Sequence, residues 1–332
     1  MATSGSITSI TTTYAGEFAG KYVAAALLSA PTIEKGGVEI LPNIKFKQVM
    51  QKMALTDVLS DASCDFTRTD DAITLTERVL EVKDLQVNLE LCKLDFHNTW
   101  QGIEQGYSSF DVLPKSFEDY LIGYVAEKVA ARNEVNFWRG DSSTSGEYDG
   151  ITTQLAVDAG LPAAQEIAGT TVTAANVIDE LGSIVDAIPS TVYGREDLHI
   201  YISQNIARAY VRALGGFAAL TNVAGTENVA SRGANGVDNR GTLWYGMGQD
   251  LAFDGVKLFV ANGLADNTAI AAQKSNLFFG CSLNSDLQEV KLLDMSDLDG
   301  SNNCRVIMRM ACGAQYAIVD DIVTYGIVNS AN

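Results

Sequence analysis

The chain has 332 residues, of which 47% are hydrophobic and 19% charged. This length and composition fit a globular chain of roughly two domains and exclude a wholly disordered one. Its 41 acidic and 23 basic residues give a formal net charge of −18. Because binding to nucleic acid regardless of sequence needs cations that contact phosphates, this charge disfavours such binding.

The cysteines predict neither a disulfide framework nor a zinc site, because they are odd in number, widely spaced and never in a C-x-x-C pair. A reducing, intracellular origin fits this pattern best. Residues 22–30 form an apolar run that is too short to span a bilayer and lacks the basic leader of a secretory signal. The five cysteines are Cys64, Cys92, Cys281, Cys304 and Cys312.

Residues 1–44 form a distinct opening segment. Ser and Thr dominate positions 3–13, Ala dominates positions 24–30, and Pro31 and Pro42 interrupt regular structure. This pattern predicts an extended arm with one short helix at about residues 15–29 rather than a packed domain.

The next segment has the period-two pattern of a half-buried strand. Residues 85–91 alternate between Leu or Val and other side chains, and residues 73–76 alternate Ile or Leu with Thr. Asp70 and Asp71 mark a candidate loop tip, and a change of phase after residue 92 predicts a β-bulge there. Residues 62–96 are therefore predicted to form a long, partly exposed β excursion.

The strongest helix signal covers residues 116–138. Pro114 ends the preceding segment, and Ser116 followed by Asp119 resembles a capping box. The predicted helix would be a rod of roughly 35 Å with one apolar face to bury. We expect Trp138 to anchor this helix in the core. The apolar stripe consists of Phe117, Tyr120, Leu121, Tyr124, Val125, Val129, Val135 and Trp138.

A glycine-punctuated segment, 140–150, follows this helix. We expect Gly140 and Gly150 to let the chain turn around an exposed loop at 141–148. The segment is not a phosphate-binding loop, because Gly140 and Gly146 are too far apart and Glu147 replaces the required Lys.

The remainder of the chain predicts an α/β insert followed by closing strands. We expect a helix at 174–188, a strand at 198–202, a helix from a cap at Ser203 to Leu214, and a loop at 224–241. Turns are expected at Asp299 with Gly300 and at Gly313. The further predicted strands are 256–260, 276–281, 288–294, 303–311 and 315–325.

No constellation of residues predicts catalysis. His97 lacks a neighbouring ligand, and His199 lies on a predicted strand where a structural role is favoured. Residues 294–300 lack the ligands of a calcium loop. Asp320 and Asp321 are adjacent on a predicted strand, so their side chains should point to opposite faces. We therefore expect no catalytic residues, no cofactor site and no metal site.

The order of parts indicates association with other copies. A long one-sided helix, an exposed β excursion and an arm leave apolar surface and strand edges that the chain does not itself cover. Symmetric homo-oligomers are the usual solution.

Three stretches resemble tailed-bacteriophage major capsid proteins of the Hong Kong 97 type. "ITLTERVLEVKDLQVNLELCKLDFHNTW" resembles the extended E-loop and return strand, and "YDGITTQ" resembles a family step after a short loop. "LPKSFEDYLIGYVAEKVAARNEVNFWRGD" resembles the spine helix, with Glu134, Phe137, Trp138 and Gly140 matching its ending. The "LELCKLDF" element is also reminiscent of capsid proteins from crAss-like and other Bacteroidota phages.

This resemblance implies an α+β capsid fold and a division of the chain into five parts. They are an N-terminal arm (1–44), the E-loop and return strand (45–96), a peripheral (P) domain with the spine helix (97–171), an axial (A) domain (172–270) and closing P-domain strands (271–332). The structural and assembly candidates are Phe117, Tyr120, Leu121, Tyr124, Val135, Trp138, Gly140 and Gly150.

The same resemblance implies a function and partners. The chain would assemble with itself into hexamers and pentamers, forming an icosahedral shell around double-stranded DNA without sequence-specific binding or a membrane. Portal, scaffolding and decoration proteins would be further partners, and assembly would occur in the cytoplasm of the bacterial host.

Two alternatives stay open. An encapsulin-like compartment would share the fold but hold a protein cargo. A ligand-binding protein or enzyme of the α/β class would use the loop at 224–241. The polar or conformationally free residues of that loop include Gly225, Arg232, Asn235, Asp238 and Arg240.

Overall fold

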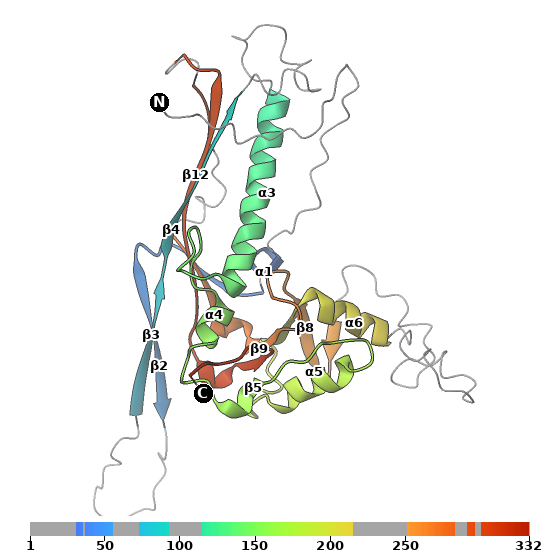
Figure 1. Ribbon diagram of the computed structural model, residues 1–332. Coiled ribbons are helices and arrows are strands. Elements are labelled where there is room, and N and C mark those ends of the chain that lie inside the picture. Colours follow the sequence, from blue (N-terminus) through green and yellow to red (C-terminus); the bar gives the residue numbers. More distant parts are fainter. Residues whose placement is uncertain are drawn as a thin grey trace, which may run out of the picture.

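The computed structural model of the protein describes most of the chain, and every structural statement below concerns that part. Figure 1 shows a long helix and long strands that rise from a body carrying the shorter helices. The chain is thus of mixed α and β structure, as expected. The described residues are 31–35, 37–55, 73–92, 115–214, 251–282, 291–295 and 300–331.

The first large sheet supports the long helix α3 (Lys115–Arg139). Its strands follow the order β1-β10-β12-β11, and β4 pairs antiparallel with β12 over ten residue pairs. Leu85 and Val87 of β4 pack with Val129 of α3 in one apolar cluster. The strands are β1 (Glu39–Leu41), β4 (Lys83–Cys92), β10 (Leu277–Cys281), β11 (Lys291–Asp294) and β12 (Asn303–Tyr316).

The strand predicted from the alternation at 85–91 and the helix predicted at 116–138 are both present. Along β4 the residues at 85, 87, 89 and 91 are half-buried while those at 84, 86, 88 and 90 are exposed, because one face of the strand meets α3. The bounds of α3 differ by one residue at each end from those predicted. Ser116 therefore lies within the first turn, but its side chain lies outside the described residues, so its expected role as the N-cap stays a prediction. The expected β-bulge after residue 92 lies outside the described residues.

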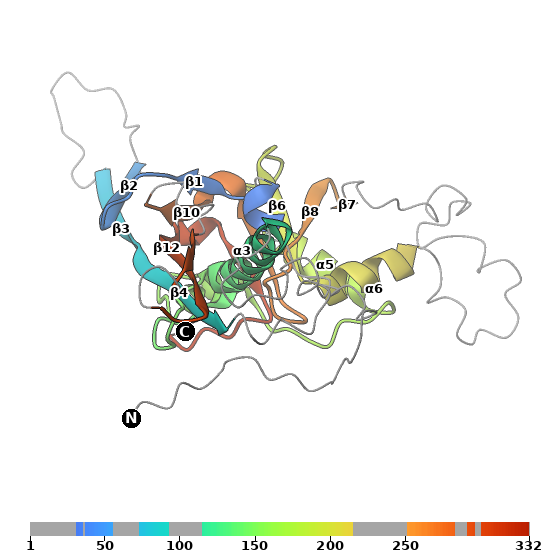
Figure 2. The same ribbon diagram turned by 90° about the horizontal axis from the view of Figure 1, so that it is seen from above.

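The second large sheet has the order β5-β13-β9-β6-β8-β7. Helices α5 (Val177–Asp186) and α6 (Gln204–Leu214) contribute to the same apolar cluster as this sheet. Figure 2 places α6 on the opposite side of α3 from a two-stranded ribbon formed by β2 (Lys47–Leu55) and β3 (Ile73–Glu81). The strands are β5 (Glu166–Ile167), β6 (Leu198–Ile202), β7 (Leu251–Phe253), β8 (Val256–Val260), β9 (Ala269–Gln273) and β13 (Val323–Tyr325).

Most predicted elements of this region are present, but β9 was missed. The strands β6 and β8 have the predicted bounds, and α6 begins directly after Ser203 as expected. The helix expected at 174–188 is shorter, with a turn preceding it. All five residues of β9 are buried, because its two faces pack into different apolar clusters: Ala269 and Ala271 into one, Ile270 and Ala272 into the other. Such a strand has no polar face, so it gives no alternating signal.

The turn expected at Gly313 is wrong. Residues 303–316 form the single strand β12, and Gly313 lies opposite Gly280 of β10. A side chain at Gly313 would collide with the backbone carbonyl oxygen of Glu81, so the glycine permits a close approach between strands rather than a turn. Gly300, by contrast, has φ of +72°, as a turn requires.

The last expected strand, 315–325, is also interrupted. A 3₁₀ turn at Val319–Asp321 (η5) separates the end of β12 from β13, so Asp320 and Asp321 do not lie on a strand. The argument that strand geometry directs their side chains to opposite faces is therefore wrong. Two further 3₁₀ turns are η2 (Ala163–Gln165) and η4 (Lys274–Asn276), and a short helix, α4 (Ile151–Leu155), follows the glycine segment.

Residues 31–44 are packed into the body rather than extended away from it. The short helix α1 (Pro31–Glu34) contributes the buried Thr32, and Val38 and Ile44 are buried in two different apolar clusters. Strand β1 pairs in parallel with β10. The helix expected at about 15–29 lies outside the described residues.

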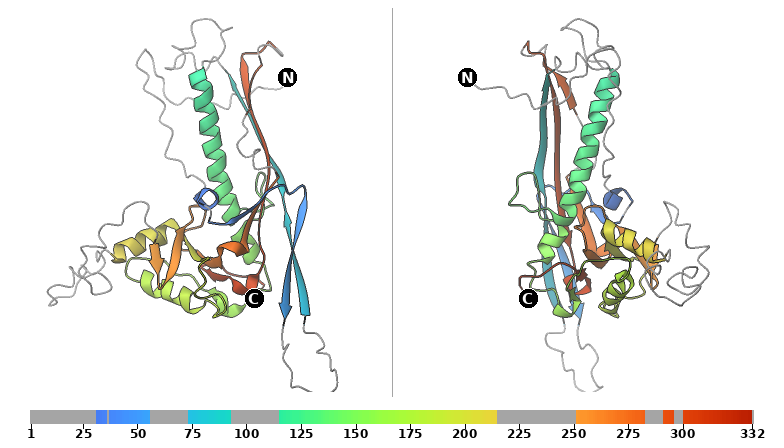
Figure 3. Two further views of the ribbon diagram at one scale, coloured as in Figure 1. Left: turned by 180° about the vertical axis from the view of Figure 1, so that it is seen from behind. Right: turned by 45° about the vertical axis from the view of Figure 1, so that its right-hand side comes forward.

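A two-stranded ribbon projects from the body. It pairs β2 (Lys47–Leu55) with β3 (Ile73–Glu81) in an antiparallel register that places Lys47 opposite Glu81. Figure 3 shows the ribbon on the side of the body away from α6, with its free end pointing past the body. This ribbon is the outer part of the expected β excursion, although β2 had not been predicted as a strand.

Candidate assembly surfaces

The outer face of the β2–β3 ribbon exposes apolar side chains. Val49 lies opposite Val79, and their exposed fractions are 51% and 42%; Phe46, just before β2, is 64% exposed. Polar pairs flank the valines on the same face: the Lys47 Nζ lies 2.9 Å from Glu81, and the Gln51 Nε2 donates to Glu77 over 3.2 Å. A two-stranded ribbon is marginally stable in water, so an apolar outer face of this kind favours contact with another surface.

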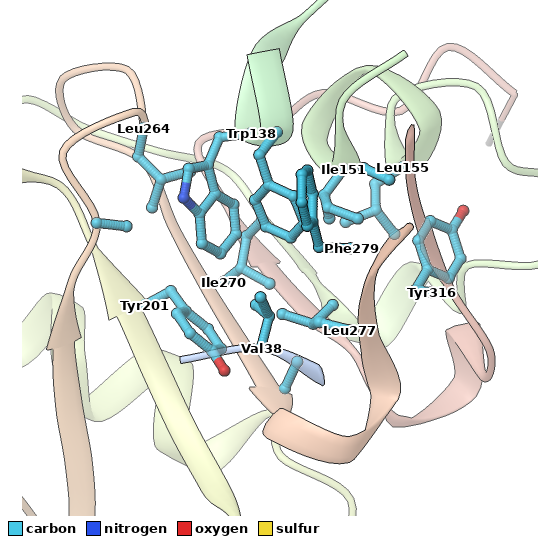
Figure 4. Close-up of a cluster of buried hydrophobic side chains, with 14 of the residues drawn as sticks. Val38, Trp138, Ile151, Leu155, Tyr201, Leu264, Ile270, Leu277, Phe279 and Tyr316 are labelled. Atoms are coloured by element: carbon cyan, nitrogen blue, oxygen red, sulfur yellow. The ribbon is translucent and has the colours of Figure 1, made fainter. Parts of the chain in front are cut away.

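The C-terminal end of α3 is fixed by burial. Trp138 and Phe137 are fully buried, and the indole centroid lies 5.1 Å from the rings of both Phe137 and Tyr201. Figure 4 shows the Trp138 indole beside Leu264 and above Tyr201. These contacts join α3 to strand β6, so the expected burial of Trp138 in the core is confirmed.

Beside Trp138 lies a buried carboxylate. Glu134 is fully buried and accepts hydrogen bonds from the hydroxyl and the backbone N–H of Thr32, and from the Trp138 Nε1 over 3.2 Å. Burial raises the pKa of Glu134, although the donors from Thr32, Trp138 and the Gly263 backbone counteract part of this effect. Glu134 thus ties the segment at 31–34 to the long helix.

The glycine segment after α3 is a tightly packed joint. The Gly150 N–H donates to the Gly140 carbonyl over 2.9 Å, and a side chain at Gly150 would come within 2.6 Å of the Arg139 nitrogen. Gly150 has φ of −79°, whereas Gly146 has φ of +83°. The chain therefore reverses at Gly146, and Gly140 and Gly150 are required for close approach instead of for the turn.

Polar contacts hold this joint in place. Arg132 of α3 pairs with Glu147, and the Tyr148 hydroxyl donates to the Asn133 Oδ1 over 2.7 Å. Burial raises the pKa of Tyr148 well above its ordinary value, so this hydroxyl stays protonated and remains a donor. The joint is thus a rigid connection rather than the mouth of a binding site.

The other residues singled out on α3 have different surroundings. Tyr124 is 37% exposed, with the Lys128 Nζ 5.6 Å from its ring centroid, while Val125 is buried and Val135 half-buried. Tyr124 therefore lies off the buried face. The side chains of Phe117, Tyr120 and Leu121 lie outside the described residues. Assembly roles for all these residues stay predictions.

Few groups in the described part of the chain are arranged for chemistry. The His199 ring nitrogen Nδ1 lies 2.8 Å from the carbonyl oxygen of Asp197. No three His, Cys, Asp or Glu side chains gather where they could hold a metal ion among the described residues. Of the helices described, none is both long and apolar enough to cross a bilayer. His97, Cys64 and the loop at 224–241 lie outside the described residues.

No disulfide bond joins the four cysteines that the structure describes. Cys281 and Cys312 lie directly opposite each other on β10 and β12, and both are buried. Burial, together with the neighbouring Cys281, raises the pKa of Cys312 to about 12. A thiol with this pKa is a poor nucleophile at neutral pH.

The fold is that of phage capsid subunits. Three solved structures illustrate the similarity: the capsid of the native GTA particle (TM-score 0.57, 14% identity, 97% of this chain and 96% of that one), the capsid of the empty GTA particle (0.55, 13%, 92% and 92%), and the capsid of the cyanophage P-SCSP1u (0.55, 15%, 94% and 92%). No family model and no curated protein matches the sequence.

The sequence did not indicate the residues that shape the ribbon surface. Residues 47–55 read KQVMQKMAL, which has neither a clear period of two nor a turn signal, so β2, and Val49 with it, was not predicted. The regular alternation lies in β3, and β2 is recognised as a strand by its pairing with β3.

Proposed function

We propose that the chain is the major capsid protein of a tailed bacteriophage of the Hong Kong 97 type, a structural protein rather than an enzyme. The observation that carries this proposal is the likeness to capsid subunits over more than nine-tenths of the chain. The long helix, the projecting ribbon and the two sheets support the same interpretation.

In this proposal the parts of the chain have distinct roles. Residues 1–44 form the N-terminal arm, and residues 45–96 form the E-loop and its return strand. Residues 97–171 form the P domain, with α3 as its spine helix, and residues 172–270 form the A domain. The last segment, 271–332, returns to the P domain through β10, β11 and β12. Its final strand, β13, pairs instead with β9 and β5, so the segment also completes the sheet of the proposed A domain.

Assembly follows from surfaces that a single copy leaves uncovered. The arm and the ribbon would lie over neighbouring subunits in hexamers and pentamers, and the apolar outer face of the ribbon would be buried there. Many weak contacts of this kind make a closed shell stable. The shell would form in the host cytoplasm with scaffolding and portal proteins, enclose double-stranded DNA, and take up decoration proteins in the virion.

The test is to express the chain alone and measure its mass by light scattering after size exclusion, with negative-stain images of any heavy fraction. Closed particles, pentamers or hexamers are expected. A chain that remains monomeric at high concentration, with and without its scaffold, would overturn the proposal. Particles packed with protein instead of DNA when isolated from their natural host would indicate an encapsulin.

A matched pair of variants connects assembly with the ribbon. Val49→Asp should abolish the heavy fraction without lowering the melting temperature of the monomer, because Val49 is already exposed there. Val328→Asp is the control, since Val328 is 77% exposed and lies near the C-terminus rather than on the ribbon.

A further inference from the structure

Two cysteines face each other in the first large sheet. Cys281 is the last residue of β10, and the register places it opposite Cys312 of β12. Both side chains are fully buried and belong to the apolar cluster that contains Phe279 and Trp138. Since directly paired residues of an antiparallel ladder point to the same face, the two thiols are neighbours in one core.

The hydrogen bonds around this pair define the kind of site it occupies. The Ser282 N–H donates to the Ala311 carbonyl over 3.1 Å, so residues 282 and 311 form a hydrogen-bonded pair. Such pairs alternate with non-hydrogen-bonded ones along the ladder, so Cys281 and Cys312 form a non-hydrogen-bonded pair. In agreement, the Cys281 carbonyl accepts instead from the Ile44 N–H over 3.1 Å.

This kind of site has the spacing that a disulfide needs. The Cα atoms of a non-hydrogen-bonded pair lie about 4.5 Å apart, closer than those of a hydrogen-bonded pair. Disulfides join residues whose Cα atoms are about 4.4–6.8 Å apart. A bond between Cys281 and Cys312 would therefore require no movement of the backbone.

A second observation indicates that the two sulfur atoms interact. Burial raises the pKa of Cys312, and the charge of Cys281 raises it further. A charge has this effect on a buried group only when it lies close by. The electrostatic coupling therefore agrees with the spacing expected from the register.

The other two cysteines that the structure describes are not arranged in this way. Cys304 lies opposite Leu91 of β4 and Asp294 of β11, whereas Cys92 lies opposite Asn303. Successive residues of a strand point to opposite faces, so Cys92 and Cys304 lie on different faces of the sheet. They provide an internal comparison for the pair at 281 and 312.

The pair is placed at a junction of the sheet. In the order β1-β10-β12-β11, with β4 also on β12, the β10–β12 ladder connects β1 and β10 to the other strands. A bond at 281 and 312 would hold the end of this ladder and close the segment 282–311, which contains β11, into a loop. Closing such a loop stabilises a fold mainly by restricting the unfolded chain.

We propose that Cys281 and Cys312 form a disulfide that joins β10 to β12 when the protein leaves a reducing environment, with a small peroxide as the oxidant. One thiolate attacks hydrogen peroxide, the O–O bond breaks, and a sulfenic acid and hydroxide form. The second thiolate attacks the sulfenic sulfur, the S–O bond breaks, and a second hydroxide leaves. The two hydroxides take up the protons that the two thiols released, so the products are one disulfide and two waters.

The folded chain makes this reaction slow but selective. Burial keeps the thiols protonated, so oxidation proceeds in those molecules in which the end of the ladder opens locally. A peroxide is small and uncharged, which suits a buried site better than a bulky organic disulfide does. If the proposed function holds, the bond would form in shells released from the host cytoplasm. The pairing of the two thiols does not depend on that function.

The experiment uses the full-length chain with Cys64→Ser and Cys92→Ser, so that the remaining cysteines are Cys281, Cys304 and Cys312. Hydrogen peroxide is added in urea below the unfolding transition, where local opening is more frequent. Thiols are then counted with a maleimide after denaturation, and the intact mass is measured. The chain should lose two hydrogens and two thiols, a peptide map should join 281 to 312, and dithiothreitol should restore both thiols.

Two further variants in the same background are the controls. Cys304→Ala should lose two thiols as before, whereas Cys312→Ala should form no bond within the chain. The oxidised chain should also unfold at a higher urea concentration than the same chain after dithiothreitol. Cys312→Ala should show no such difference.

Three results would contradict the disulfide. They are thiols that stay reduced after local opening, thiols that gain oxygen without joining, and a bond that includes Cys304. Should the serine background fail to fold, peptide mapping of the unaltered chain after the same treatment identifies the joined residues directly.

Discussion

The end of the long helix and the projecting ribbon are attached to the same body by opposite means. Trp138 and Phe137 are held by full burial among side chains of several strands. The ribbon beyond Leu80 is held by the ion pairs of Arg78 and Lys52, by a hydrogen bond from Gln315 to the Val79 carbonyl, and by the half-buried Met50. Burial of a large aromatic side chain stabilises a fold by about 3–5 kcal/mol, whereas a partly exposed ion pair such as Lys52–Asp320 contributes about 1 kcal/mol or less. The buried end of the helix, called the frame below, is therefore the more strongly held of the two regions.

The largest expected effect is at the frame. Trp138→Ala should lower the free energy of unfolding by about 3–5 kcal/mol, because the substitution leaves a large cavity among Phe137, Tyr201 and Leu264. Urea unfolding followed by circular dichroism measures it. Tyr124→Ala on the exposed side of the same helix is the control, and an equal loss in both variants would contradict the contrast between the two regions.

The second effect is at the base of the ribbon, where the Glu81 backbone passes over Gly313. Gly313→Ala should cost about 1–3 kcal/mol, because the added Cβ would collide with the Glu81 carbonyl and force the strands apart. Thermal unfolding measures it. Gly123→Ala provides the comparison: no atom lies within 4 Å of its Cβ position on α3, so alanine should stabilise the helix by up to about 1 kcal/mol. A stable Gly313→Ala would show that the strands can separate there at little cost.

The third effect is a pH dependence of the free energy of unfolding, which arises from Glu134 in the frame. The pKa of Glu134 is raised in the folded chain, so between its ordinary value of 4.5 and the folded value the folded state holds more protons than the unfolded one. The free energy of unfolding should therefore fall as the pH rises through this window. Glu134→Gln should remove that dependence in pH-series denaturation. Its amide oxygen can still accept from the Thr32 hydroxyl and from Trp138, whereas its amide nitrogen cannot accept from the Thr32 backbone N–H. An unchanged slope would assign the dependence to other groups.

The smallest effect is at the ion pair between Lys52 of the ribbon and Asp320 of the body. Lys52→Gln should change the free energy of unfolding by less than about 1 kcal/mol, because its pair with Asp320 is partly exposed. The Asp158 contribution has the opposite sign of pH dependence to that of Glu134. Although burial opposes it, hydrogen bonds donated to Asp158, among them that of Arg78, lower its pKa, so the contribution is present above 3.8 and is lost as the pH falls through the folded value. Titration of Asp158 by carboxyl-resolved NMR checks the direction.

Local patterns in the sequence were sufficient for the parts that have one buried face. The alternation at 85–91 and the stripe of α3 follow from a single covered side, and both elements are present with nearly the predicted bounds. The same reasoning failed for β9, which is buried on both faces, and for β2, whose sequence KQVMQKMAL places polar and apolar residues on each face. Neither strand has the contrast between faces on which periodicity depends.

Glycine was the least informative residue in the sequence. Gly313 and Gly140 were read as turns, yet both serve close approach between segments that are far apart or folded back in the chain. A glycine indicates only that a side chain would be unfavourable at that position. The cause can be a positive φ or a neighbouring backbone, and the sequence alone does not distinguish the two.

The long helix, the β excursion and the burial of Trp138 could be predicted from the sequence, because these features depend on local propensity and on one apolar face. The order of the elements also pointed to the capsid fold. Three sets of contacts are visible only in the folded chain: Glu134 meets Thr32, Leu80 packs on Gly280 while the Glu81 backbone passes over Gly313, and Arg78 and Lys52 reach Asp158 and Asp320. The hydrogen-bonded partners lie 80, 102 and 268 residues apart in the sequence, and no local pattern encodes such separations.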